Sequence, residues 1–174
     1  MPAKNSTVQI RMFHAGDLVP VLAVERVAFP EGPYTGAMFR ELYRDCAGLF
    51  FVAIRSRRIV GYMVTCVEKA EAEIVSIGVD PKSQKMGIGT RLMEHTLAAL
   101  EERGIRRVEL AVRTTNKDGA RFYRRFGFRS AGRIRRYYED GCDAYRMKRS
   151  QSAKSTAGYR ATSLKGLGRR RAAL

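Results

Sequence analysis

The segment from residue 71 to residue 104 constrains the fold of this chain more than any other. The stretch "EIVSIGVD" has the character of a strand, and Asp80-Pro81 ends it because proline has no N–H to donate to a ladder. After a short loop, Gly87 and Gly89 precede a long helical pattern that Gly104 closes. Its apolar residues repeat at i, i+4 and i+7: Met93, Leu97 and Leu100. A strand, a loop and a helix in this order are typical of an α/β fold.

Strand and helix patterns alternate through the rest of the chain in the order β-α-α-β-β-β-α-β-α-β-β. This order predicts one α/β domain with a mixed sheet of six or seven strands and helices on both faces. The predicted strands are residues 8–12, two within 49–67 around a charged turn, 70–80, 106–112, 128–138 and 143–149, the last two joined as a hairpin by "EDG". The predicted helices are residues 16–28 with Asp17 as cap, about 38–46, the one after Gly89, and one capped by Asn116 and ended by Gly127.

The charge is unevenly distributed along the chain and predicts two parts. Residues 151–174 hold six basic residues and no acid, so a net charge of +16 for the whole chain leaves +10 on residues 1–150. We expect a folded domain over residues 1–150 and a flexible basic tail over residues 151–174. The tail is either a solvated end or a contact for an anionic partner such as the ribosome.

Several classes of protein are not expected from this sequence. No apolar run approaches the roughly 20 residues that span a bilayer, and the first ten residues lack the apolar core of a secretory signal. Cys46, Cys66 and Cys142 are odd in number and form no Cys-x-x-Cys pair, which favours reduced thiols in a cytoplasmic protein. His14 and His95 lie far apart without other ligands at metal spacing, so we expect no metal.

The two glycines before the long helix do not belong to the common nucleotide-binding motifs. A P-loop requires G-x-x-x-x-G-K-[ST], which is absent. A dinucleotide fingerprint requires a third glycine where Leu92 stands, and its first glycine follows a strand directly, whereas residues 81–86 separate Asp80 from Gly87. Two interpretations remain. Either the exposed N–H groups at this helix N-terminus bind a pyrophosphate, or the glycines form a tight turn without a ligand.

The motifs from about Glu73 to Met147 resemble those of the GNAT superfamily of acetyl-CoA-dependent N-acetyltransferases. The family signature [QR]-x-x-G-x-[GA] is present as "QKMGIG", residues 84–89, and "LAVRTTNKDGARFYRRFGF" is similar to the family's strand, Asn, helix, Tyr and "GF". The final "RRYYEDGCDAY" resembles the paired tyrosines and acidic turn of bacterial Rim-type and archaeal protein N-terminal acetyltransferases. The resemblance covers most of residues 7–149.

The resemblance implies a GNAT-like domain whose two central strands, "EIVSIGV" and "VELAV", separate within the sheet. It also implies acetyl-CoA as co-substrate, held mostly by main-chain groups: the first strand would bind the pantetheine arm and the thioester carbonyl, and the loop after it the pyrophosphate. The residues implied in binding acetyl-CoA are Ile77, Gly78, Val79, Gln84, Lys85, Met86, Gly87, Ile88, Gly89, Thr90, Asn116 and Tyr123.

The catalytic residues are also inferred from the resemblance. Tyr123 matches the family tyrosine that protonates the departing thiolate, with an ordinary core tyrosine as the alternative. Rim-type enzymes have a glutamate in "LEVR", but this chain has Ala111 there, which cannot accept a proton. Glu73 stands where archaeal and eukaryotic relatives have His or Tyr, and Glu31 in "FPEGPY" resembles a loop glutamate beside the acceptor amine. Both are candidate bases, and the alternative is that they are surface carboxylates that only offset nearby positive charge.

The predicted acceptor is a primary amine, most directly the N-terminal α-amine of a protein of the ribosomal type. An α-amine with a pKa of about 8 is partly neutral near neutral pH, whereas a lysine amine at about 10.4 needs a much stronger base. We expect Tyr34 and Tyr138 to line the acceptor groove, with Tyr138 preferred over its strand neighbour Tyr137. The alternatives are a small-molecule amine as acceptor, or a non-catalytic module that binds coenzyme A or docks on nucleic acid. The sequence leaves both a monomer and a dimer open.

Overall fold

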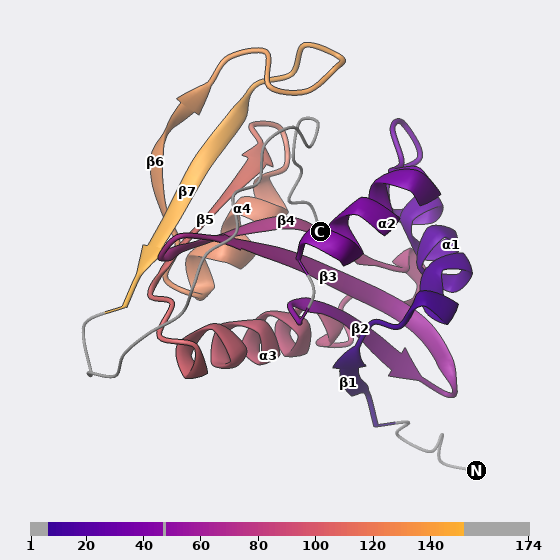
Figure 1. Cartoon of the computed structure of the whole chain (residues 1–174). Coiled ribbons are helices and arrows are strands. Elements are labelled where there is room, and N and C mark those ends of the chain that lie inside the picture. The colour runs from indigo at the N-terminus through magenta and orange to yellow at the C-terminus, as the bar shows by residue number, and fades with distance from the viewer. Residues whose placement is uncertain (1–6, 47, 152–174) are drawn as a thin grey trace.

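The computed structural model describes residues 7–46 and 48–151, which form a seven-stranded mixed sheet covered by helices on both faces (Figure 1). The strand order is β1-β2-β3-β4-β5-β7-β6, and only β4 and β5 run parallel among the pairs in the described part. The elements are β1 (Gln9–Met12), α1 (Leu18–Ala28), α2 (Gly36–Asp45), β2 (Phe50–Arg55), β3 (Arg58–Glu68), β4 (Glu71–Val79), α3 (Ile88–Glu102), β5 (Arg107–Arg113), α4 (Lys117–Arg125), β6 (Arg129–Ile134) and β7 (Ala144–Ser150). The predicted fold class and element order are confirmed.

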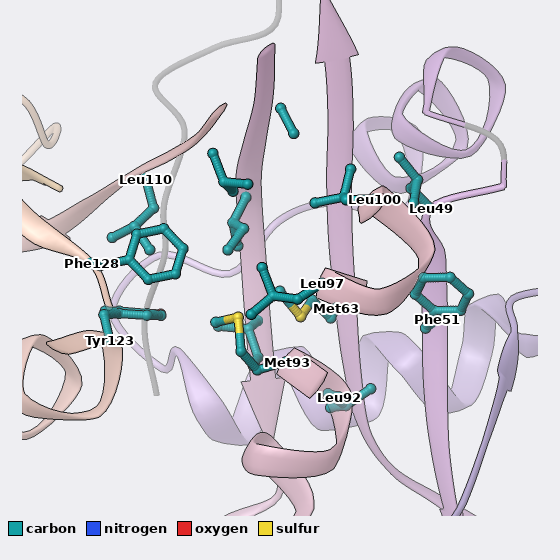
Figure 2. Close-up of a cluster of buried hydrophobic side chains, with 14 of the residues drawn as sticks. Leu49, Phe51, Met63, Leu92, Met93, Leu97, Leu100, Leu110, Tyr123 and Phe128 are labelled. Atoms are coloured by element: carbon teal, nitrogen blue, oxygen red, sulfur yellow. The ribbon is translucent and has the colours of Figure 1, made fainter. Parts of the chain in front are cut away.

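Two hydrophobic cores lie on opposite faces of the sheet, because the central strands are apolar on both sides. The larger core, beneath α3 and α4, is built from the helical repeat Leu92, Met93, Leu97 and Leu100 against β2, β3 and β5 (Figure 2). The other core lies beneath α1 and α2 and contains Phe39, Phe50 and Tyr62. A strand buried on both faces needs no alternating pattern, which explains the continuous apolar runs of β2 and β3.

The helix ends follow their local sequence signals. Gly87 precedes α3 and Gly104 follows it, both with positive φ. Asn116 caps α4, because its Oδ1 accepts a hydrogen bond from the Gly119 N–H at 2.8 Å. Asp17 stands at the start of α1 as predicted, but its carboxylate accepts hydrogen bonds from Arg11 and from the main-chain N–H of His14 instead of from the first turn of α1.

The last two strands pair antiparallel as predicted, but the prediction that the first of them continues to Tyr138 and turns directly at "EDG" is wrong. β6 ends at Ile134 and β7 begins at Ala144, so residues 135–143 form an irregular loop that contains both Tyr137 and Tyr138. Arg136 has a φ of 48°, which extended backbone does not allow, and its N–H donates to the Asp143 carboxylate. The "EDG" residues do turn the chain, since the Gly141 N–H donates to the Tyr138 carbonyl, but they do so outside the sheet.

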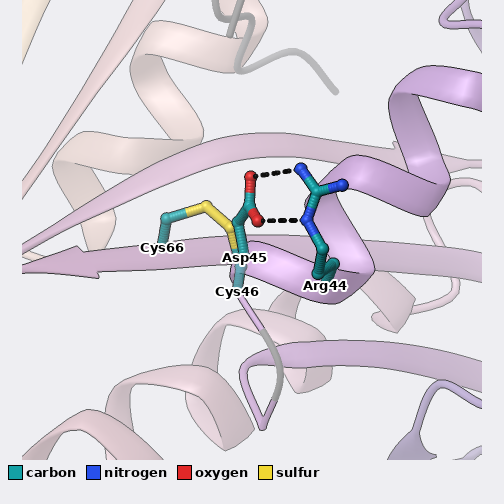
Figure 3. Close-up of a disulfide and its surroundings, with 4 residues drawn as sticks. All are labelled: Arg44, Asp45, Cys46 and Cys66. Atoms are coloured by element: carbon teal, nitrogen blue, oxygen red, sulfur yellow. Dashed lines mark hydrogen bonds and ion pairs between the residues drawn. A yellow bond between two sulfur atoms is a disulfide. The ribbon is translucent and has the colours of Figure 1, made fainter. Parts of the chain in front are cut away.

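The expectation that all three thiols are reduced is also wrong in this structure. Cys46, at the end of α2, and Cys66, on β3, form a disulfide with their Cα atoms 4.7 Å apart (Figure 3). Residues 20 positions apart in sequence meet because α2 packs on β3 and buries both side chains. The number and spacing of the cysteines therefore give no reason to place the protein in a reducing compartment. Cys142 is a free thiol.

Within the described ranges, no helix has both the length and the apolar character required to cross a membrane. The domain boundaries, residues 1–150, stay a prediction, and β7, the last strand in the described residues, ends at Ser150. The predicted basic tail, residues 151–174, lies outside the described residues except for Gln151, whose N–H donates to the Arg106 carbonyl.

Candidate active site

The two central strands of the sheet separate, as expected from the resemblance. β4 and β5 are paired only from Glu71 to Ile74, whereas β4 continues to Val79 and β5 to Arg113. Beyond Ile74 each strand stays paired with its other neighbour, β4 with β3 and β5 with β7. A wedge therefore opens within the sheet between the second half of β4 and the end of β5.

Main-chain groups of β4 face this wedge. The Asp80 N–H donates to the Val60 carbonyl at 2.9 Å, and the register pairs Val79 with Gly61. Hydrogen-bonded and non-hydrogen-bonded pairs alternate along an antiparallel ladder, so Ile77 and Val79 direct their N–H and C=O groups away from β3. These groups are where a pantetheine arm and a thioester carbonyl can form strand-like hydrogen bonds.

The N-terminus of α3 is open, as an anion site requires. The Arg91 N–H donates to the Gly87 carbonyl, so the N–H groups of Ile88, Gly89 and Thr90 precede the first hydrogen bond of the helix. No side chain caps this end, and a β-carbon at Gly87 would meet no atom within 4 Å. The predicted phosphate loop thus presents its N–H groups to solvent, with the positive end of the helix dipole behind them.

Tyr123 lies within the larger core, with its ring packed edge-on against Phe128 (Figure 2). The side chain is 0% exposed, and its hydroxyl has no hydrogen-bond partner among the residues described. Burial, and secondarily the nearby Tyr138, raises the pKa of the Tyr123 phenol far above its usual value. The group stays protonated at any physiological pH, and it is a buried donor that finds no acceptor in residues 7–46 and 48–151.

A cavity of about 280 Å³ lies where β4 and β5 separate, and it brings together six of the predicted site residues. They come from four segments far apart in sequence: Glu31, Gly78, Val79, Gln84, Asn116 and Tyr138. The Gln84 side-chain amide also donates to the Val79 carbonyl at 3.4 Å, which fixes the start of the phosphate loop against the strand. The cavity is therefore bounded by the wedge, the phosphate loop and the loop after α1.

Arg113 is a residue of this cavity that the sequence analysis did not single out. Its guanidinium carbon lies 4.0 Å from the centroid of the Tyr138 ring, and its Nη1 is 2.6 Å from Asp140 Oδ2. The ion pair and the cation–π contact orient Tyr138 at the cavity wall. The sequence feature that could have pointed to it is its position at the end of β5, two residues after Ala111.

Glu31 and Glu73, the two candidate bases, lie in different hollows. Glu31 is exposed on the rim of the cavity described above. Glu73 lies on β4 before the strands separate, opposite Glu109, in a second hollow of about 470 Å³. Glu109 itself is paired with Lys148 at 3.3 Å. The geometry favours Glu31 as the carboxylate nearer the wedge, and the role of either residue stays a prediction.

The two predicted acceptor tyrosines are placed differently. Tyr138 is buried at the cavity wall, although it reaches that position from a loop and not from a strand. Tyr34 is 6% exposed and its ring packs on Phe39 in the core beneath α1 and α2. The ring of Tyr34 is not part of the cavity lining, so this geometry does not support direct contact with an acceptor.

No three His, Cys, Asp or Glu side chains converge in a metal-binding arrangement in the ranges described. The residues predicted for the site supply main-chain donors, one buried phenol and an exposed carboxylate, although Tyr123 is not among the residues that line the cavity. Such a set can bind a diphosphate, polarise a carbonyl, accept a proton and donate one, which are the requirements of acyl transfer from a thioester.

The sequence and the fold were compared with those of known proteins. The Acetyltransferase (GNAT) family matches residues 19–128. The N-alpha-acetyltransferase of Sulfolobus acidocaldarius is 32% identical over 152 residues, which cover 80% of this chain and 90% of the relative.

Two solved structures are similar in fold. The ribosomal-protein-S18-alanine N-acetyltransferase from Escherichia coli has a TM-score of 0.77 and 28% identity, over 88% of this chain and 99% of that one. Arabidopsis thaliana Naa50 in complex with the bisubstrate analogue CoA-Ac-MVNAL has a TM-score of 0.73 and 25% identity, over 83% of this chain and 99% of that one.

Proposed function

This chain belongs to the GNAT family of acetyltransferases, and on that premise we propose that it transfers the acetyl group of acetyl-CoA to the N-terminal α-amine of proteins. One observation carries the proposal. The cavity where β4 and β5 separate joins the phosphate loop to the exposed carboxylate of Glu31, so a thioester in the wedge would meet an amine beside a base. The names of the relatives given above support an α-amine as acceptor.

The chain's own groups fit acetyl-CoA as the co-substrate. The N–H groups of residues 85–90 would bind the pyrophosphate, and the main chain of Ile77 and Val79 would bind the pantetheine arm and the thioester carbonyl. Asn116 would contact the arm. The buried hydroxyl of Tyr123 would find its missing acceptor in the thioester sulfur.

The transfer needs only modest acid–base assistance. Glu31, through one water, takes a proton from the ammonium form of the acceptor, whose pKa of about 8 already leaves part of it neutral. The amine nitrogen attacks the carbonyl carbon, the new C–N bond forms and the C–S bond breaks. The nitrogen, which still carries two protons when it attacks, releases the second one to solvent through the same water and becomes the amide. Tyr123 donates its hydroxyl proton to the departing sulfur and is reprotonated from solvent as the product leaves, because the raised pKa disfavours a lasting phenolate.

We propose to test as acceptors the N-termini of proteins that are synthesised in the cytoplasm, beginning with ribosomal proteins. The measurement is mass spectrometry of synthetic peptides incubated with the full chain and acetyl-CoA. Each peptide is supplied with a free N-terminus, and again with a blocked N-terminus and an internal lysine. We expect one acetyl group on the free N-termini alone. Acetylation of spermidine or an amino sugar without any peptide product would contradict the proposal.

A further inference from the structure

We propose that Glu25, which does not line the cavity, is a positioning residue. It holds the loop that carries Glu31 against β4, the strand that would bind the thioester. We call residues 29–34 the acceptor loop. The inference rests on the proposed function for its effect on activity, and on the hydrogen bonds of Glu25 for its geometry.

Glu25 is a charged residue with no exposed surface. It follows Val21 by one turn of α1, so both side chains point into the core beneath α1 and α2. A carboxylate in such a place must accept hydrogen bonds, because an unpaired buried charge is very unfavourable. Its Oε1 accepts from the main-chain N–H of Tyr34 at 2.6 Å, and its Oε2 accepts from the hydroxyl of Tyr62.

Both ends of the acceptor loop are attached to this one residue. The Phe29 N–H donates to the main-chain carbonyl of Glu25 at 2.8 Å, and the Tyr34 N–H donates to its side chain. Between them the Gly32 N–H donates to the Phe29 carbonyl, which keeps the loop compact. Glu31 therefore lies on a short loop whose two ends are fixed by residue 25.

The same carboxylate is connected to β4 through one side chain. The hydroxyl of Tyr62 lies 2.9 Å from Ser76 Oγ, and the ring of Tyr62 packs on Gly78. Ser76 and Gly78 flank Ile77, whose main chain faces the wedge. Glu25 and Tyr62 thus set the spacing between the acceptor loop and the thioester-binding part of β4.

Glu25, Tyr62 and Ser76 are not among the residues that line the cavity, so they act through the residues that do. A displacement of about 1 Å at a reacting group can lower a rate about 100-fold. We expect Glu25→Ala to lower kcat/KM for an acceptor peptide about 10- to 100-fold. The Kd for acetyl-CoA should change much less than the acceptor kinetics, because β4 stays hydrogen-bonded to β3 whichever residue stands at position 25.

Glu25→Gln is the conservative variant and should restore near-normal kinetics. The glutamine oxygen can accept from the Tyr34 N–H, and its amide can donate to the Tyr62 oxygen, which still donates to Ser76. Tyr62→Phe removes the connection to β4 alone and should impair acceptor kinetics less than Glu25→Ala. Thr96→Ala is the matched control, since it removes a buried hydroxyl that donates to the Met63 sulfur in the other core.

The experiment measures three quantities for each variant: acceptor kcat and KM, acetyl-CoA Kd, and amide hydrogen exchange of the acceptor loop. We expect faster exchange at Tyr34 in Glu25→Ala and in neither Glu25→Gln nor Thr96→Ala. The inference is overturned by wild-type acceptor kinetics in Glu25→Ala, by an equal loss of acetyl-CoA affinity, or by equal impairment in Glu25→Gln. If the wild-type chain acetylates no peptide, the proposed function fails, and the exchange measurement still decides whether Glu25 holds the loop.

Discussion

The ring of Tyr62 lies directly against the Cα of Gly78, and a β-carbon added at Gly78 would be 2.6 Å from Tyr62 Cε1. The ring cannot move aside at little cost, because it is fully buried and its hydroxyl is bonded to Glu25 and Ser76. A glycine in the middle of a strand is explained here by the close approach of a side chain from the neighbouring strand.

Gly78→Ala should therefore destabilise the domain by about 1–3 kcal/mol through overpacking. It should also raise KM for acetyl-CoA, because the strand that faces the wedge is displaced. Urea denaturation and steady-state kinetics measure the two effects. Gly16→Ala is the control, since a β-carbon there meets no atom within 4 Å, and an equal loss in both variants would argue against the clash.

Tyr123→Phe should separate activity from stability. Loss of the proton donor should lower kcat about 100- to 10,000-fold. The free energy of unfolding should be unchanged or higher by about 1 kcal/mol, because the variant removes a buried hydroxyl that has no partner in the described residues. Rapid-mixing kinetics and chemical denaturation provide the two readouts. Retained activity would mean that another group protonates the thiolate.

Glu31→Gln and Glu73→Gln distinguish the two candidate bases. We expect Glu31→Gln to lower kcat/KM by about 10- to 100-fold at pH 7, with recovery at higher pH as the acceptor amine loses its own proton. Glu73→Gln should be close to wild type, because Glu73 lines the other hollow. The pH profile of both variants with one peptide gives the answer, and the reverse result would assign the base to Glu73.

Asp17 should make stability depend on pH in the acid range. Hydrogen bonds from Arg11, and the main-chain N–H of His14, lower the pKa of the Asp17 carboxyl below its usual 3.8 although burial opposes them. Because the pKa of Asp17 is lower in the folded protein than in the unfolded chain, its contribution to the free energy of unfolding is complete at pH values above the pKa of the unfolded chain. This contribution is lost as the pH falls through the lower pKa of the folded protein. Asp17→Asn should thus cost about 1–3 kcal/mol near pH 6.

The difference in unfolding free energy between wild type and Asp17→Asn should shrink steadily below about pH 4. Denaturation curves from pH 6 to pH 2 measure it. A difference that stays constant over this range would show that the carboxylate charge is not what stabilises the start of α1.

The disulfide between Cys46 and Cys66 should stabilise the domain by about 3 kcal/mol, since it closes a loop of 20 residues in the unfolded chain. Reductant should lower the Tm of the wild-type chain by several degrees. It should leave the Tm of the Cys46→Ala/Cys66→Ala double variant unchanged. A wild-type Tm that is indifferent to reductant, together with titration of three free thiols, would contradict the bond.

The order of helices and strands was predictable because its signals are local. Asn116 caps α4 through a residue three positions ahead, and Gly87 precedes α3 with a backbone angle that its own lack of a β-carbon permits. The end of β6 was not predictable, because the strand pattern continues to Tyr138 while Arg136 leaves the extended conformation to meet Asp143. A long-range contact overrode a local preference there.

The sequence alone determined the α/β architecture and the order of its elements, since these depend on residue types at short, fixed spacing. The phosphate loop and the role of Tyr123 stay predictions. Only the tertiary structure decided which carboxylate reaches the wedge, that Tyr34 belongs to a core, and that Cys46 meets Cys66. It also joined Glu25 to Tyr62, residues 37 positions apart. These relationships arise from the packing of helices on the sheet, which brings together residues that no local pattern relates.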